Sequence, residues 1–99
     1  MTYGSRPTEL KASDFARAIT RSQRRRLMAG RFESGDDVVA LRRFVGLSQG
    51  AFSRALGISV HTLRNWEQGR RTPEGPALAL LRIVARHPRV LKENLKRVA

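Results

Sequence analysis

Two short stretches with the start and stop signals of helices follow each other between residues 48 and 69, and only Gly57 and Ile58 separate them. Ser48 and Ser59 stand where the two helices begin, because a serine hydroxyl accepts hydrogen bonds from the free N–H groups of a first helical turn. Gly57 tolerates the left-handed conformation that a sharp turn needs. So short a connection forces the helices to cross steeply and leaves the second one projecting. The rest of the domain therefore has to support this helix pair.

The second helix of the pair has the size of a helix that enters the major groove of DNA, as in a helix-turn-helix. Arg suits guanine, Asn suits adenine and Val suits a thymine methyl group. We therefore expect base contacts from its outward positions, which are Val60, His61, Arg64 and Asn65. Simple solvent exposure is the alternative for His61, while Trp66 shares a face with Leu63 and is expected in the core. A plain helical hairpin is the alternative for the pair, but the basic residues at positions 70 and 71 favour DNA.

The charge of the chain points to a polyanionic partner. The 99 residues include 20 Lys and Arg against 8 Asp and Glu, a formal charge of +12, which exceeds what solubility requires. The longest apolar stretch, residues 76–81, is far shorter than the ~20 residues of a membrane span, and no signal peptide is evident, so we expect a cytoplasmic protein. The chain contains no Cys and two separate His residues, so we expect neither a metal site nor a cofactor.

The spacing of apolar residues predicts an all-α chain that begins with a basic extension, residues 1–35. Residues 1–12 lack an apolar period, as a flexible tail does. A helix rich in arginine is expected from Ser13 and Asp14 to about Gly30. We expect this extension to be partly helical or flexible.

Residues 36–99 are expected to form a DNA-binding and dimerisation domain of about five helices. The first runs from Asp36 to about Val45, the next two form the helix pair, the fourth spans residues 77–85, and the last begins at Pro88. The fourth helix is apolar on most sides, which is more than one face of a small domain should need. No stretch alternates between apolar and polar residues as a strand does.

Residues 46–73 read GLSQGAFSRALGISVHTLRNWEQGRRTP. They contain a Gln-x-x-Phe-Ser opening, a central Gly and a Trp-Glu-x-Gly-x-x-x-Pro ending. These features resemble the Cro/CI-type helix-turn-helix family, and the resemblance covers about residues 37–73. It implies a small lambda-repressor-like fold. It also implies a homodimer that binds an inverted-repeat operator of double-stranded DNA, with half-sites about one helical turn apart.

The resemblance also implies roles for single residues. Gln49 would brace the recognition helix as well as contact DNA. Arg42 and Glu67 match a largely buried ion pair that ties the first helix of the domain to the recognition helix, and its role is structural because breaking such a pair strands a charge. Phosphate contacts, which position a protein on DNA, would come from Gln49, Ser59, Thr62, Arg70 and Arg71.

A longer pattern, Asn-Trp-Glu-Gln-Gly-Arg-Arg-x-Pro-x-Gly-Pro-Ala followed by Leu-Leu and Arg-His-Pro, is similar to HigA-type antitoxins. Such proteins neutralise a RelE-like ribonuclease toxin and repress their own operon. They commonly dimerise through the helices after the Trp-Glu motif. The alternative is that these helices are ordinary core helices. The candidates for a dimer seam are Leu81, Val84, Leu91, Leu95 and Val98.

The basic extension leaves the role of its charge open. Residues 1–35 contain eight Arg or Lys against three acids, whereas a toxin that grips RNA should itself be basic and repelled. The extension could instead lie along DNA phosphates or be the solvated face of one more helix. A stand-alone transcriptional regulator without a toxin partner is therefore the alternative to an antitoxin, and an unspecific nucleic-acid coat is a weaker third hypothesis.

We expect no enzymatic activity. Residues 46–50 match the Gly-x-Ser-x-Gly pattern of serine hydrolases, but no strand precedes Ser48, and the chain is too short to assemble the partner residues on a large sheet. Asp36 and Asp37 are adjacent on a helix, so their carboxylates point apart.

Overall fold

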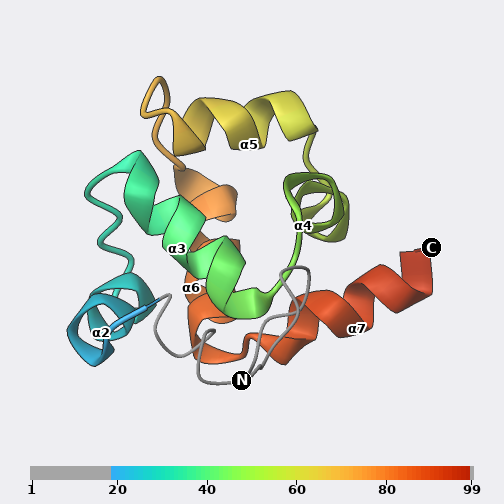
Figure 1. Cartoon of the computed structure of the whole chain (residues 1–99), viewed down its shortest axis with the longest axis horizontal. Helices are drawn as coiled ribbons and strands as arrows, with labels where there is room; N and C mark the ends of the chain where they lie inside the picture. The colour runs from blue at the N-terminus through green and yellow to red at the C-terminus, as the bar shows by residue number, and fades with distance from the viewer. Residues whose placement is uncertain (1–18, 99) are drawn as a thin grey trace, which may run out of the picture.

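A computed structural model describes residues 19–98, and the regular secondary structure of this part consists of α-helices alone (Figure 1). No helix in it is long and apolar enough to cross a membrane. The predicted all-α fold is confirmed. The helices are α2 (Arg21–Met28), α3 (Gly35–Val45), α4 (Gln49–Leu56), α5 (Val60–Glu67), α6 (Gly75–Arg86) and α7 (Arg89–Val98).

The predicted helix boundaries around the α4–α5 turn are confirmed by hydrogen bonds. The Oγ of Ser48 accepts from the backbone N–H of Ala51 at 3.1 Å, and that of Ser59 accepts from Thr62 at 3.0 Å. Gly57 ends α4 with φ +77°, in the left-handed region that glycine adopts without steric cost. Because Ser48 caps a helix and no strand precedes it in the described part of the chain, it does not sit on a hydrolase elbow.

One core joins all six helices. Phe52 of α4 and Leu63 of α5 are fully buried in it, together with Leu41 of α3 and Leu81 of α6. Helix α5 packs on α3 and α4, α4 also packs on α7, and α2 packs on α6. Figure 1 shows the result: α5 lies along one edge of the molecule, while α2 and the end of α6 lie at the opposite side.

The first described helix starts later than the sequence suggests. Ile19 and Thr20 are not helical, and the Oγ1 of Thr20 accepts from the backbone N–H of Gln23 at 3.0 Å, which fixes the start of α2 at Arg21. The prediction of one continuous helix from residues 13–14 to about Gly30 is therefore wrong at residues 19–20. Thr20 caps the start of a new helix there and is not itself helical. Residues 13–18 and the expected flexible tail lie outside the described residues. Leu27 of α2 is fully buried.

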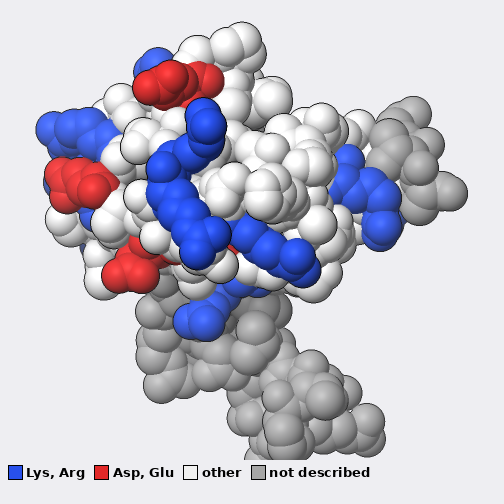
Figure 2. All heavy atoms as spheres, turned by 90° about the horizontal axis from the view of Figure 1, so that it is seen from above, with Lys and Arg blue, Asp and Glu red and all other residues white. Residues whose placement is uncertain are grey.

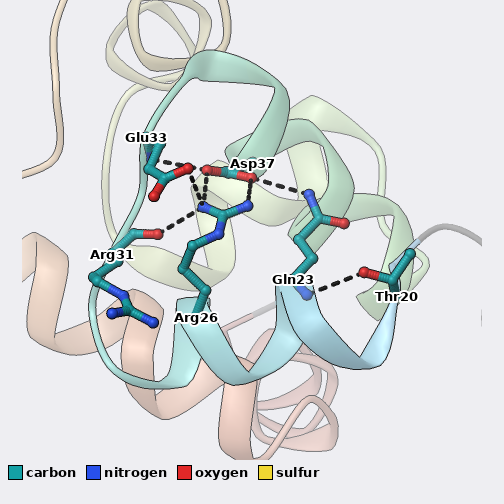
Figure 3. A network of polar contacts seen from close by, with 6 residues as sticks. All are labelled: Thr20, Gln23, Arg26, Arg31, Glu33 and Asp37. Atoms are coloured by element: carbon teal, nitrogen blue, oxygen red, sulfur yellow. Dashed lines mark hydrogen bonds and ion pairs between the residues drawn. The ribbon is translucent and has the colours of Figure 1, made fainter.

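A network around the buried carboxylate of Asp37 fastens α2 to the first turn of α3 (Figure 3). Arg26 donates two hydrogen bonds to it, at 2.6 and 2.9 Å, and Gln23 donates one at 2.9 Å. The backbone N–H of Glu33 adds a fourth at 2.8 Å. Burial disfavours the charged form, but the hydrogen bonds and the charge of Arg26 outweigh it and hold the pKa of Asp37 well below its usual range.

The predicted dimer seam on the last two helices needs a correction. Leu81, Val84 and Leu91 are 0%, 1% and 5% exposed, so they fill the core of the protomer and leave no surface for a second copy. Leu95 is partly buried against that core, and the side chain of Val98 is not among those described. Because α6 is apolar on most sides, the sequence does not show which side faces inward. The large apolar side chains exposed on these helices are Leu80, Ile83 and Val90.

Candidate nucleic-acid interface

Helix α5 presents one face to the core and the opposite face to solvent. Leu63 and Trp66 are buried, as predicted for Trp66 from its spacing. His61 and Arg64 are exposed, and Val60 and Asn65 are partly buried at the margins of the outer face. The four predicted base-contacting residues therefore lie on one helix, with His61 and Arg64 projecting furthest into solvent.

The chain turns back sharply after α5 and places two arginines beside its end. The carbonyl oxygen of Asn65 accepts hydrogen bonds from the backbone N–H groups of Arg70, at 2.9 Å, and Arg71, at 3.3 Å. Gly69 permits this turn with φ +75°. The side chains of Arg70 and Arg71 are exposed, so both can reach a phosphate next to a helix lying in a groove.

A polar network anchors α5 to the two preceding helices. Glu67 accepts from the Nε of Arg42 at 2.7 Å and from the side-chain amide of Gln49 at 2.9 Å. Arg42 also donates to the carbonyl oxygen of Leu47 at 3.1 Å, and Arg64 reaches the amide oxygen of Gln49 at 3.4 Å. The ion pair expected between Arg42 and Glu67 is present, and Gln49 braces α5 as the resemblance implies. These contacts fix the angle at which α5 projects.

The first turn of α5 offers exposed donors. The hydroxyls of Ser59 and Thr62 lie 3.0 Å apart, and the free N–H groups of a helix N-terminus favour an anion. Figure 2 views the molecule from the side of α5 and shows Lys and Arg side chains across the middle of this face, with Asp and Glu nearer its edges. The phosphate contacts of Ser59 and Thr62 stay predictions.

Sequence reasoning missed two contacts made by the first turn of α3, one with α5 and one with α2. Gly35 opens α3 directly against the last turn of α5, and a Cβ there would overlap the carbonyl oxygen of Glu67 and lie 2.8 Å from that of Trp66. The sequence explains Asp37 as an acidic residue at the N-terminus of a helix, but its carboxylate also accepts hydrogen bonds from Gln23 and Arg26 of α2. A glycine and an acid two residues apart at a helix start carry no separate signal for such contacts, which depend on the fold.

The chain is similar to known antitoxins and transcriptional regulators. The family model for the antitoxin component of bacterial toxin–antitoxin systems, MqsA, matches residues 5–95. Antitoxin HigA-2 of Vibrio cholerae is 48% identical over 58 residues, which are 59% of this chain and 56% of that protein, so the chain spans little more than half of this relative. The uncharacterized HTH-type transcriptional regulator YiaG of Escherichia coli K12 is 33% identical over 66 residues, 67% of this chain and 69% of the regulator.

Proposed function

Because this chain belongs to the MqsA family of antitoxin components of bacterial toxin–antitoxin systems, we propose that it binds an inverted-repeat operator as a homodimer, neutralises a RelE-like ribonuclease toxin and represses the operon that encodes both proteins. The observation that carries the DNA-binding part is the projecting outer face of α5, held at a fixed angle by the contacts of Glu67 with Arg42 and Gln49. A rigid helix with Arg64 and Asn65 on its surface can read base edges in a major groove.

The homodimer is proposed to form through the exposed apolar side chains of the last two helices, not through the buried ones. Leu80 is 42% exposed, Ile83 47% and Val90 38%. They border a groove of about 280 Å³ that Ala55 and Leu56 of α4 also line. Burial of such side chains is the main favourable contribution to association. A two-fold dimer would present two copies of α5 to consecutive major grooves.

The proposed toxin partner is inferred from the similarity to antitoxins. Relatives with the names of antitoxins support a partner protein in general, and the longer pattern from Asn65 to Pro88, similar to HigA-type antitoxins, favours a RelE-like ribonuclease. A stand-alone regulator without a toxin is the second candidate function, and the similarity to the HTH-type regulator YiaG over two thirds of both chains favours it.

Two measurements test these parts separately. Selection of bound fragments from genomic DNA should enrich an inverted repeat, and protection of that repeat from nuclease should cover both half-sites. Enrichment of no common sequence would contradict operator binding. Purification of the tagged protein from its native cells, at moderate salt and with nuclease, should retain a small protein in equal amount that degrades RNA once it is released. Operator binding without such a protein would leave the stand-alone regulator.

A further inference from the structure

Helices α2 and α6 together form a second strongly basic surface. Their sequences, RSQRRRLM and GPALALLRIVAR, contain no acid. Arg26 is paired with Asp37, which leaves a set that we call the α2–α6 basic face: Arg21, Arg24, Arg25, Arg82 and Arg86.

Contacts between the two helices hold this face together without neutralising it. Arg24 of α2 donates to the carbonyl oxygens of Ala85, at 3.0 Å, and Arg86, at 3.4 Å. Arg86 of α6 donates in return to the carbonyl oxygen of Met28 at 3.4 Å. Each arginine thus binds the C-terminal carbonyls of the other helix, where cations are favoured. Carbonyl oxygens carry no formal charge, so both guanidinium groups keep theirs.

The remaining arginines of the face are available to a partner. The side chains of Arg21, Arg25 and Arg82 are exposed, and these side chains make no hydrogen bond or ion pair with the described part of the chain. The stem of Arg82 passes close to Gly30, after the end of α2, so this side chain lies on the α2 flank of α6. Leu80 lies instead on the flank that borders α4 and α7. Ile83 lies between the two flanks, because it lines that groove and also a hollow with Arg82 and Arg86.

We propose that the α2–α6 basic face binds the phosphate backbone of a second DNA segment, so that one protomer can hold two duplexes. Figure 1 places α5 at one side of the molecule and α2 with the end of α6 at the other, so a duplex on α5 leaves this face open. This proposal rests on the proposed binding of one duplex by α5, but not on the recognition of an operator sequence, because phosphate contacts do not depend on sequence.

The chemistry of the face favours nucleic acid over an acidic protein. Protein partners usually bury a central apolar or aromatic cluster that supplies most of the binding energy. Of the large exposed apolar side chains of α6, Leu80 lies on the other flank and Ile83 lies at the margin of the face, beside Arg82 and Arg86. The face therefore has one apolar side chain at its margin and no central apolar cluster, and it consists mainly of guanidinium groups on two neighbouring helices. Guanidinium forks bind phosphate oxygens in pairs, and duplex DNA presents one negative charge about every 1.7 Å along its axis.

The test counts duplexes per protomer. The full chain is mixed at low salt with an excess of labelled random duplex about one helical turn long (~10 base pairs), and the complexes are sized by sedimentation velocity. The probe variant is Arg21→Ala/Arg25→Ala/Arg82→Ala. It should bind one duplex fewer per protomer than the native chain. Its affinity for random DNA should also depend less steeply on salt, by a slope of about 0.9 for each phosphate that the variant no longer neutralises.

Two further variants complete the design. The variant Arg21→Lys/Arg25→Lys/Arg82→Lys preserves the charge and should still bind the second duplex. Loss of the second duplex in this lysine variant would contradict the proposal. Arg64→Ala/Arg70→Ala/Arg71→Ala removes basic side chains on and beside α5 and should lose the other duplex, which separates a failure of α5 from a failure of the basic face. An alanine variant of the basic face that binds as many duplexes as the native chain would overturn the proposal and leave an acidic protein as the partner to seek. Circular dichroism checks that each variant is folded.

Discussion

Two buried carboxylates fasten helices to one another, and each accepts hydrogen bonds from an arginine of another helix. Glu67 receives Arg42 and Gln49, while Asp37 receives Arg26 and Gln23. The first contact was predictable from a resemblance, because both residues stand at positions of a known ion pair. The second was not, because its arginine lies in a segment whose packing no periodicity revealed. At this scale the sequence supplies the residue types, and the fold decides which of them meet.

Replacement of Asn65 by Ala should cost on the order of 1 to 3 kcal/mol of binding free energy on the selected operator, because the variant can no longer hydrogen-bond a base edge, and little on random DNA. Fluorescence anisotropy with both duplexes measures the difference. Arg54→Ala is a matched control, since Arg54 is an exposed residue of α4. Equal losses on the two duplexes would remove the base-reading role of Asn65.

Replacement of Asp37 by Asn should lower the free energy of unfolding by about 2 to 3 kcal/mol, because hydrogen bonds to a charged group are broken and Arg26 keeps no buried counter-charge. The partial exposure of the Arg26 side chain, 22%, keeps the loss below that of a fully buried pair. Urea denaturation measures it. Asp36→Asn is the control, because Asp36 lies next to it in the same helical turn without being buried, and an equal loss there would contradict the special role of Asp37.

The same carboxylate predicts a dependence of stability on pH. The pKa of Asp37 in the folded protein lies well below the value of about 3.9 found in unfolded chains. Its contribution is therefore complete above the unfolded value and is lost as the pH falls through it toward the folded value. The difference in unfolding free energy between the native chain and Asp37→Asn should narrow as the pH is lowered from about 5 to 2. A constant difference over this range would contradict the assignment.

At the scale of elements, the helices built from local signals were predictable and the ones that depend on packing were not. The α4–α5 pair follows from two serine caps and Gly57, all within a few residues of the bonds they make. The inward side of α6 could not be chosen, since both of its sides are apolar and only the positions of α2 and α7 decide between Leu80 and Leu81. The start of α2 was missed because Thr20 lies inside a stretch that otherwise suits a helix.

Replacement of Gly35 by Ala should destabilise the protein by about 1 to 3 kcal/mol, because the new Cβ meets backbone carbonyls of α5 that cannot move without shifting the helix. The same shift should weaken operator binding. Gly50→Ala is the matched control, since a Cβ at this position in α4 meets open space. That variant should gain about 0.5 to 1 kcal/mol from helix propensity. Thermal melting of both variants tests this contrast. A Gly35→Ala protein with the stability of the native chain would show that α3 can move away from α5 without cost.

At the scale of the whole molecule, three different surfaces have three different proposed partners. We propose that the outer face of α5 reads an operator, that the α2–α6 basic face holds a second duplex, and that the groove bordered by Leu80 and Ile83 receives another copy of the chain. The formal charge of +12 exceeds what the α5 side alone accounts for, since several arginines lie on α2 and α6 instead. In the proposed dimer, operator binding would depend most on this groove, because the contact between copies would set the spacing of the two recognition helices.

The double replacement Leu80→Glu/Ile83→Glu should therefore give a folded monomer. Both side chains are more than 40% exposed in the protomer, so the charges are solvated there, whereas in the dimer they would be buried without partners. Operator affinity should fall by about 100-fold or more, because each half-site then binds separately. Leu81→Ala should do the opposite: it should destabilise the protomer by about 2 to 5 kcal/mol through a core cavity and leave the dimer interface intact. Sedimentation equilibrium distinguishes the monomeric double variant from the dimeric Leu81→Ala variant. A double variant that stays dimeric at the concentrations at which the native chain is dimeric would place the interface elsewhere on the molecule.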